Sequence, residues 1–162
     1  MSATVIAYVA LGSNLGDRRA HLEAAFAALA ALPGTRLEAR SALYETAPLG
    51  PPGQQDYFNA VARLATALPP HAVLDALLVI ERERGRVRSE RWGPRTLDLD
   101  LLLHGDAAVR DERLTLPHPG LLARAFVLAP LHDLAPDLVL AGRTVAQHLA
   151  TLDRSGVRRL AR

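Results

Sequence analysis

The fold of this chain is decided by an apolar run near its N-terminus, Val5-Ile6-Ala7-Tyr8-Val9-Ala10-Leu11. The run is apolar at both odd and even positions, as is typical of a strand that is buried on both faces. It ends at Gly12-Ser13-Asn14-Leu15-Gly16-Asp17, where glycine permits a tight turn and a close approach of backbone. We therefore expect this stretch to be the central strand of a sheet.

A helix is predicted directly after this strand. Asp17 is a residue type that favours the N-cap position. Leu22, Phe26 and Leu29 follow at the i, i+4, i+7 spacing of one buried stripe. Pro33-Gly34 then ends the helix.

Strand and helix patterns continue to alternate beyond this point. Residues 37–43 and 58–66 have strand character, a helix begins at Pro69-Pro70, and residues 96–103 form a further strand. The resulting order, β-α-β-β-α-β, is that of the ferredoxin-like core. The fold class expected is therefore α+β.

The remaining residues add to this core. We expect a hairpin at residues 107–114 and short helices at residues 121–131 and 145–152. The whole chain, residues 1–162, is then one domain, with helices layered on both sides of the sheet (α/β/α).

Composition excludes several chemistries. All 19 basic residues are arginine and there is no cysteine, which excludes a Schiff-base amine, a Walker-type lysine, a thiol nucleophile and a zinc–thiolate site. The net charge of +2 and the low aromatic content of 4% argue against a nucleic-acid partner. The opening apolar run is too short for a membrane span, and no basic residues precede it as in a signal peptide. We expect a cytoplasmic protein with no membrane partner.

Two carboxylates stand out in the segment Arg95-Thr96-Leu97-Asp98-Leu99-Asp100. In a strand, Asp98 and Asp100 share one face with Cα atoms about 6.5 Å apart, while the leucines face the core. A divalent cation relieves their repulsion, and oxygen ligands favour Mg²⁺, whose coordination substrate phosphates complete. The alternative is a solvated strand face with two incidental acids.

The segment before this strand, residues 81–95, carries six arginines against three glutamates. Gly85, Gly93 and Pro94 make part of it a loop. Guanidinium groups bind phosphate oxygens in a bidentate way and keep their charge, so a basic loop that leads into an acidic strand predicts a metal–polyphosphate site. A solvated, arginine-rich helix end is the alternative.

Three further places are candidates. Tyr57 and Asn59 share a strand face beside the Pro/Gly-rich loop 47–56, where a ring and an amide suit a planar heterocycle, although ordinary packing explains them too. His118, between two prolines, either contacts a ligand or is structural. The segment Gly12–Arg18 lacks the P-loop pattern, so we interpret it as a turn.

Together these segments resemble the 6-hydroxymethyl-7,8-dihydropterin pyrophosphokinase family (2-amino-4-hydroxy-6-hydroxymethyldihydropteridine diphosphokinase) of folate biosynthesis. The motifs that match it are Tyr8-Val9-Ala10-Leu11-Gly12-Ser13-Asn14-Leu15-Gly16-Asp17, Tyr44-Glu45-Thr46-Ala47-Pro48-Leu49-Gly50, Asp56-Tyr57-Phe58-Asn59-Ala60, Gly85-Arg86-Val87-Arg88, Arg91-Trp92-Gly93-Pro94-Arg95-Thr96-Leu97-Asp98-Leu99-Asp100 and Leu116-Pro117-His118-Pro119. They occur in order, with family-like spacing, between residues 4 and 140. The run from Arg91 to Asp100 is highly specific to this family.

The resemblance implies a transferase that moves pyrophosphate from ATP to the hydroxymethyl group of the pterin and releases AMP. It implies two Mg²⁺ ions on Asp98 and Asp100, and catalytic roles for Arg86 and Arg95 on a mobile loop. The positions around ATP are matched by Glu81, Arg88, Trp92, Arg113, Thr115 and His118. The pterin pocket is matched by the side chains of Tyr57, Asn59 and Phe126 and by backbone groups of Thr46, Pro48 and Leu49, with Gly12 and Arg124 also near the site.

The expected mechanism is in-line attack by the pterin hydroxyl on the β-phosphorus of ATP, with arginines and Mg²⁺ neutralising charge. Loops 47–56 and 84–95 are expected to close over the substrates and exclude water. Two departures from the family pattern bear on this: the loop between Arg88 and Arg91 is one residue shorter than in some members, and Pro119 stands where some carry tyrosine.

Two other functions stay open at this point. A ferredoxin-like module could sense a nucleotide without chemistry, and a ferredoxin-like RNA binder is disfavoured because the strands lack paired exposed aromatics. No residue is a clear general base, and His118 is a candidate by type alone. We expect a monomer.

Overall fold

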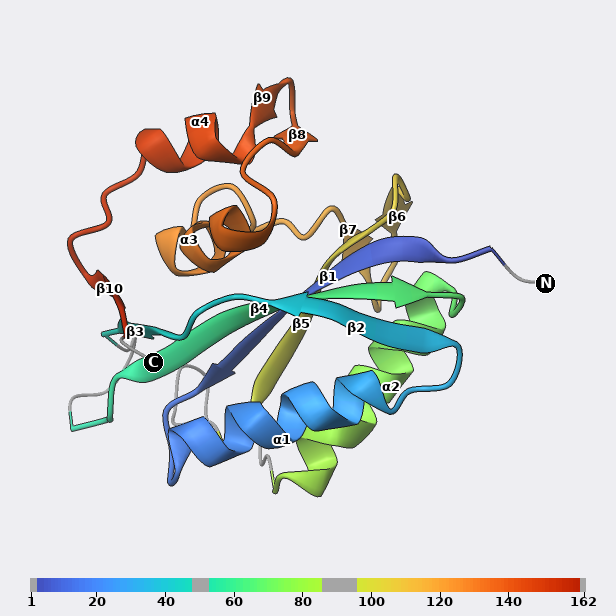
Figure 1. Ribbon diagram of the computed structural model, residues 1–162, viewed down its shortest axis with the longest axis horizontal. Helices are drawn as coiled ribbons and strands as arrows, with labels where there is room; N and C mark the ends of the chain where they lie inside the picture. Colours follow the sequence, from blue (N-terminus) through green and yellow to red (C-terminus); the bar gives the residue numbers. More distant parts are fainter. Residues whose placement is uncertain (1–2, 48–52, 86–95, 161–162) are drawn as a thin grey trace.

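The computed structural model describes residues 3–47, 53–85 and 96–160. Within these ranges the largest sheet has six strands, in the order β10-β3-β4-β1-β5 with β2 also paired to β4. All of its pairings are antiparallel (Figure 1). β1 (Val5–Ser13) lies between β4 (Tyr57–Thr66) and β5 (Asp98–His104), so the prediction of a central strand is confirmed.

The other elements follow the ferredoxin-like order and then add short C-terminal pieces. They are α1 (Arg18–Ala30), β2 (Thr35–Arg40), β3 (Tyr44–Thr46), α2 (Pro70–Glu83), β6 (Val109–Arg110), β7 (Thr115–Leu116), α3 (Ala125–Leu134), β8 (Val139–Leu140), β9 (Arg143–Thr144), α4 (Val145–Ala150) and β10 (Val157–Arg159).

Helices α1 and α2 cover one face of the sheet (Figure 1). Asp17 caps α1, because its side chain accepts a hydrogen bond from the Ala20 backbone N–H at 3.0 Å. The predicted stripe of α1 is buried, with Leu22 and Leu29 at 0% exposure and Phe26 at 2%. These side chains pack on the sheet, so burial of an apolar stripe stabilises the helix.

Helices α3 and α4 lie on the opposite side, with α3 between the sheet and α4 (Figure 1). Leu128 and Leu131 of α3 are fully buried against Val61 of β4 and Leu102 of β5. The α/β/α layering predicted from the sequence is therefore confirmed. None of the helices in the described ranges is long and apolar enough to cross a bilayer.

The predicted strand at residues 37–43 is wrong at its C-terminal end, because β2 stops at Arg40, residues 41–43 belong to no strand, and the separate strand β3 begins at Tyr44. Between them, the Ser41 backbone N–H donates to the Val61 carbonyl at 2.9 Å, and the Ser41 hydroxyl accepts from the Val61 N–H at 2.9 Å. The side chain thus takes the place of a backbone acceptor, and the regular pairing of β2 with β4 ends at Arg40, just before this residue.

Other boundaries are also corrected. The hairpin expected at residues 107–114 pairs two-residue strands that end at Leu116. The helix expected from residue 121 begins at Ala125, because Arg124 is its N-cap in extended conformation. Strand β10 was not predicted, since three residues carry too little pattern to identify a strand.

Candidate active site

The register of the sheet brings three predicted site residues into one row. Gly12 of β1 is the Cα partner of Asn59 in β4 on one side and of Asp98 in β5 on the other. Their neighbours Leu11 and Leu99 belong to the core under α1 and α2. Because side chains alternate along a strand, the row lies on the opposite face, toward α3.

Gly12 leaves space in the middle of this row. A Cβ at this position would lie 3.1 Å from Asn59 Oδ1 and 3.5 Å from Tyr57 Cδ1. The first distance is shorter than a normal contact between such atoms. Glycine therefore keeps a narrow gap between the amide of Asn59 and the carboxylate strand.

The amide of Asn59 is held in a fixed orientation. The residue is 7% exposed, and its Nδ2 donates a hydrogen bond to Thr46 Oγ1 at 2.7 Å. Since Nδ2 is directed at β3, the acceptor Oδ1 is directed at the gap over Gly12. Thr46 and Asn59, both predicted in the pterin pocket, are thus in direct contact.

Asp98 and Asp100 share the face predicted for them, with the core leucines on the other side. Asp98 is half-buried, and the side chain of Asp100 is 54% exposed. Between them the Leu99 backbone N–H donates to Glu81 Oε2 at 2.8 Å. Glu81 is only 4% exposed, so a buried carboxylate of α2 fixes the backbone that carries the two aspartates.

His118 faces Asp100 across a short distance. Its Nε2 lies 4.0 Å from Asp100 Oδ1, and its Nδ1 accepts from the Gly120 N–H at 3.0 Å. Burial lowers the pKa of His118, Asp100 opposes this effect, and the positive charge of Arg124 adds to it. A neutral His118 therefore carries its proton on Nε2 and presents a donor toward Asp100.

Three other predicted site residues lie in elements outside the row of Asn59, Gly12 and Asp98. Thr115 lies in β7, and Phe126 lies in α3, where it is partly buried on the same side of the sheet as Asn59. Arg113 sits between β6 and β7, where its guanidinium pairs with Asp75 of α2. The partner of Arg113 in the structure is thus Asp75, and not Asp98 or Asp100 of β5.

Several predictions fall outside the described residues. They concern Pro48, Leu49, Arg86, Arg88, Trp92 and Arg95, together with the shortened stretch between Arg88 and Arg91. Their roles, and the closure of loops 47–56 and 84–95, stay predictions.

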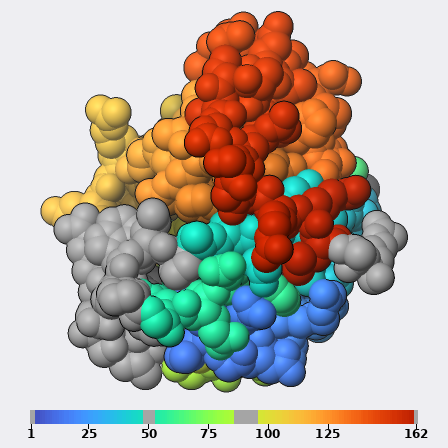
Figure 2. All heavy atoms as spheres, turned by 90° about the vertical axis from the view of Figure 1, so that its left-hand side faces the viewer, coloured from blue at the N-terminus to red at the C-terminus, as the bar shows by residue number. Residues whose placement is uncertain are grey.

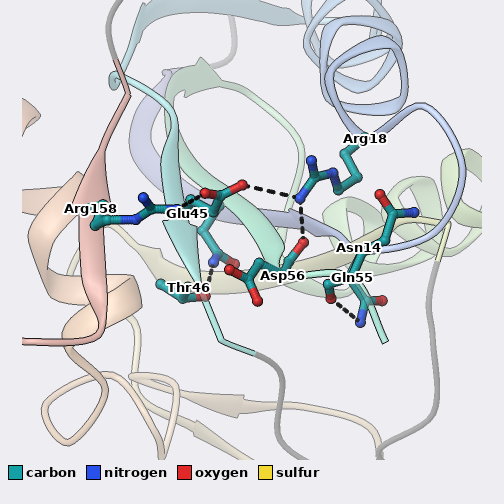
Figure 3. A network of polar contacts seen from close by, with 8 residues as sticks. Asn14, Arg18, Glu45, Thr46, Gln55, Asp56 and Arg158 are labelled. Atoms are coloured by element: carbon teal, nitrogen blue, oxygen red, sulfur yellow. Dashed lines mark hydrogen bonds and ion pairs between the residues drawn. The ribbon is translucent and has the colours of Figure 1, made fainter. Parts of the chain in front are cut away.

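The structure also shows polar contacts that the sequence did not reveal. Asn14, interpreted as part of a turn, is 1% exposed, and its Nδ2 donates to Gln54 Oε1 at 3.0 Å and to the Gln55 carbonyl at 3.3 Å. Arg18 lies between Glu45 and the backbone of Asp56 (Figure 3). The sequence signal for these contacts was the family match of segments 8–17 and 44–50, but a motif match does not show that two segments are in contact.

Within the described ranges, no group of three or more His, Asp or Glu side chains could hold a metal ion. The protein atoms near the row are instead two carboxylates, an amide and an imidazole. This donor set suits a cation whose remaining ligands come from substrate and water.

A family model described as 7,8-dihydro-6-hydroxymethylpterin-pyrophosphokinase (HPPK) matches residues 8–136. The chain belongs to this family. The HPPK match covers all the described site residues, from Gly12 to Phe126. The HPPK name describes an enzyme that transfers a pyrophosphoryl group, so the chain is a pyrophosphokinase.

Curated relatives share this name over nearly their full length. The 2-amino-4-hydroxy-6-hydroxymethyldihydropteridine pyrophosphokinase of Methylorubrum extorquens is 51% identical over 154 residues, which are 95% of this chain and 98% of that protein. Its counterpart in Pseudomonas aeruginosa is 54% identical over 154 residues, 94% of this chain and 95% of that protein. The enzyme of Bacillus subtilis is 40% identical over 153 residues, 94% of this chain and 89% of that protein.

Solved structures support the fold. An HPPK-DHPS protein in complex with substrates has a TM-score of 0.78 at 13% identity and covers 98% of this chain. The HPPK-DHPS of Plasmodium falciparum with pterin and p-hydroxybenzoate has a TM-score of 0.70 at 16% identity and covers 93% of this chain. This chain spans 47% and 43% of those two chains, so it corresponds to about half of each.

Proposed function

We propose that this chain transfers pyrophosphate from ATP to 6-hydroxymethyl-7,8-dihydropterin, in folate biosynthesis, on the sheet face that carries Asn59, Gly12 and Asp98. Membership of the HPPK family supports the reaction. The observation that supports the location is the row itself. Gly12 of the central strand lies between the oriented amide of Asn59 on one neighbouring strand and the carboxylate of Asp98 on the other.

Asp98 and Asp100 would hold Mg²⁺ with the phosphates of ATP, and we propose two ions. Carboxylate oxygens on one face of a strand fit this cation, which retains waters and accepts phosphate oxygens as ligands. When bound, the cation neutralises charge on the polyphosphate. Asp100 is exposed enough for its carboxylate to meet a polyphosphate, while the Glu81 contact keeps the strand in place.

His118 contributes a hydrogen-bond donor rather than a base in this arrangement. Its Nδ1 lone pair is already used by the Gly120 N–H, so in the neutral ring Nε2 has a proton to give. An Nε2–H facing the carboxylate strand would orient Asp100 or donate to a phosphate oxygen. Arg124, whose charge reaches His118, would add positive potential at the same place.

The pterin would lie over the other half of the row. Asn59 Oδ1 offers an acceptor above Gly12, and the ring of Tyr57 borders the same gap. Phe126, on α3 above this face, would supply a second ring. We propose that Thr46, Pro48 and Leu49 complete the polar edge.

We also propose that Arg88, Trp92, Arg113, Thr115 and His118 surround ATP, and that Arg86 and Arg95 stabilise the charge that develops during transfer. For Arg113 this requires its guanidinium to exchange Asp75 for a phosphate. Glu81, which is buried and accepts from the Leu99 N–H, would act at the ATP site through the strand that it holds. We further propose that the chain acts as a single-domain, cytoplasmic monomer without nucleic-acid or membrane partners. The small net charge of +2 argues against a nucleic-acid partner.

Product analysis tests this function. The protein is mixed with ATP, Mg²⁺ and 6-hydroxymethyl-7,8-dihydropterin, and the nucleotide product is identified. AMP that depends on both Mg²⁺ and the pterin is expected. ADP would indicate ordinary kinase chemistry, and the absence of any product would leave a nucleotide-binding module, so either result contradicts the proposal.

A further inference from the structure

Arg18, the first residue of α1, contacts the chain on both sides of Tyr57. Its Nη1 donates to the Asp56 carbonyl at 2.7 Å, and its Cζ lies 3.9 Å from the centroid of the Phe58 ring. The side chain is 21% exposed. The guanidinium thus holds the residue before Tyr57 by a hydrogen bond and the residue after it by a cation–π contact.

A carboxylate of the neighbouring strand holds this guanidinium in place. Glu45 Oε2 lies 3.2 Å from Arg18 Nη1, and the Glu45 side chain is 17% exposed. Glu45 is the Cα partner of Phe58 in the pairing of β3 with β4. The carboxylate is therefore next to the ring on which Arg18 rests, and the three groups form one compact cluster. Figure 3 shows the Arg18–Glu45 pair.

The C-terminal strand completes the cluster. Arg158 of β10 is the Cα partner of Glu45 and pairs with its second oxygen, Oε1. Figure 2 shows the C-terminal segment, in red, reaching down from the α3–α4 layer to the edge of the sheet. One carboxylate thus bridges an arginine of α1 and an arginine of β10, which are far apart in sequence.

This cluster lies under the proposed pterin pocket. Phe58 packs against the core beneath α1 and α2, whereas Tyr57 and Asn59 point to the other face. Clamping Asp56 and Phe58 from below fixes the backbone that presents Tyr57 and Asn59 above. A charge-assisted hydrogen bond to the carbonyl makes this clamp stronger than a neutral one.

We propose that Arg18 is a positioning residue for the pterin site, and that Arg158 supports it through Glu45. The proposal rests on the proposed function, because it takes Tyr57 and Asn59 as the pterin-binding side chains. It assigns a role in substrate affinity to the C-terminal strand, which carries no motif of the family.

The chain offers a matched control for the test. Arg40 makes an ion pair and a ring contact like those of Arg18: both its terminal nitrogens pair with Glu23, at 2.6 and 2.8 Å, and its Cζ lies 3.9 Å from the Phe26 centroid. This second cluster joins β2 to α1 away from Tyr57. Arg40→Ala therefore removes a comparable ion pair and ring contact without touching the pterin site.

The experiment compares wild type, Arg18→Ala, Arg18→Lys, Arg158→Ala, Arg40→Ala and the Arg18→Ala/Arg158→Ala double variant. Pterin Kd is measured by titration in the presence of Mg²⁺ and a non-hydrolysable ATP analogue, together with kcat for AMP formation and hydrogen exchange of residues 54–59. We expect Arg18→Ala to raise the pterin Kd about tenfold, to speed exchange in this segment, and to change kcat at saturating pterin little. Arg18→Lys should recover part of the affinity, and Arg158→Ala should add nothing to Arg18→Ala.

Two results would overturn the proposal. One is an unchanged pterin Kd in Arg18→Ala; the other is an equal rise in Arg40→Ala, which would make loss of stability the cause. The proposed function fails separately, when wild type releases no AMP. Wild-type turnover with unaltered affinity in Arg18→Ala contradicts the positioning role alone.

Discussion

On the face of the sheet toward α1 and α2, the side chains of β1, β4 and β5 are apolar over most of their length. On the face toward α3 they are apolar around Val61 and Leu102 and polar at one end, where Asn59, Asp98 and Asp100 lie. The difference follows from cover: two helices pack along one face, whereas α3 packs on only part of the other. The same strands thus supply a closed core on one side and a partly open, polar surface on the other.

Removing a carboxylate from the polar end should produce the largest effect. We expect Asp98→Ala or Asp100→Ala to lower kcat by about a thousandfold or more. The metal ion would lose a carboxylate ligand, and the charge of the polyphosphate would then be less well neutralised. The unfolding midpoint of Asp100→Ala should change little, since Asp100 is exposed. AMP formation and urea unfolding measure both quantities.

The matched control for this change is Asp106→Ala, in the exposed turn just after β5. It should retain turnover. Normal turnover in Asp98→Ala or Asp100→Ala would show that the two acids are incidental and that both faces of the sheet are structural.

A substitution at Leu101, the residue after Asp100, should lower stability and leave kcat unchanged, which is the reverse of the effect expected at Asp100. Leu101 is 3% exposed in the core under α1 and α2, so Leu101→Ala should lower the free energy of unfolding by about 2–5 kcal/mol through lost burial and a cavity. Its kcat, measured on folded protein, should stay near that of wild type. Leu15→Ala, at an exposed residue, is the control, and a large fall in kcat with unchanged stability in Leu101→Ala would break the distinction between the faces.

A smaller effect is expected at Gly12, in the centre of the row. The new methyl group of Gly12→Ala would press on Asn59 Oδ1 at 3.1 Å and approach the ring of Tyr57. We expect the pterin KM to rise about tenfold, with less change in kcat, because binding rather than transition-state charge is affected. The control is Gly156→Ala, whose new Cβ meets no atom within 4 Å and which should leave kcat and KM unchanged. An unchanged pterin KM in Gly12→Ala would show that the pterin does not bind in the gap over Gly12.

The smallest effect concerns Tyr44, which lies beyond Asn59 in the same row. Burial, followed by the hydrogen bond to Asp133, raises the pKa of Tyr44 to about 12. Because the folded-state pKa exceeds that of the unfolded chain, this stabilisation is fully present below pH 10 and is lost as the pH rises toward 12. Unfolding free energies from urea titrations at several pH values should therefore fall more steeply with pH in wild type than in Tyr44→Phe. Equal slopes would mean that Tyr44 ionises alike in both states.

Much of the fold was predictable because it depends on local pattern. The alternation of Asp98 and Asp100 with leucines assigns each residue to a face, and the stripe of α1 needs only the helical period. The end of β2 before Ser41 was not predictable, because it depends on a hydroxyl that accepts from the Val61 N–H of β4. Strand β10 was missed for a similar reason: only its pairing with β3 makes it a strand.

The candidate site divides in the same way. Residue type and family motif predicted Asn59, Asp98 and His118 as site residues, but not their contacts. That Nδ1 of His118 is occupied by Gly120 is a tertiary observation, and our proposal of a donor rather than a base at His118 rests on it. The clamp at Arg18 was invisible in the sequence, where this residue is one arginine among 19.

The sequence by itself determined the chemistry of the chain: arginine as its only strong cation, two carboxylates on one face of a strand, and a sheet with a doubly buried centre. These properties depend on residue type and on spacings of a few residues. Only the tertiary structure decided that Gly12 lies between Asn59 and Asp98, and that Arg158 meets Glu45 from 113 residues away. Such contacts arise from strand register and from packing between distant segments, which local spacing does not encode.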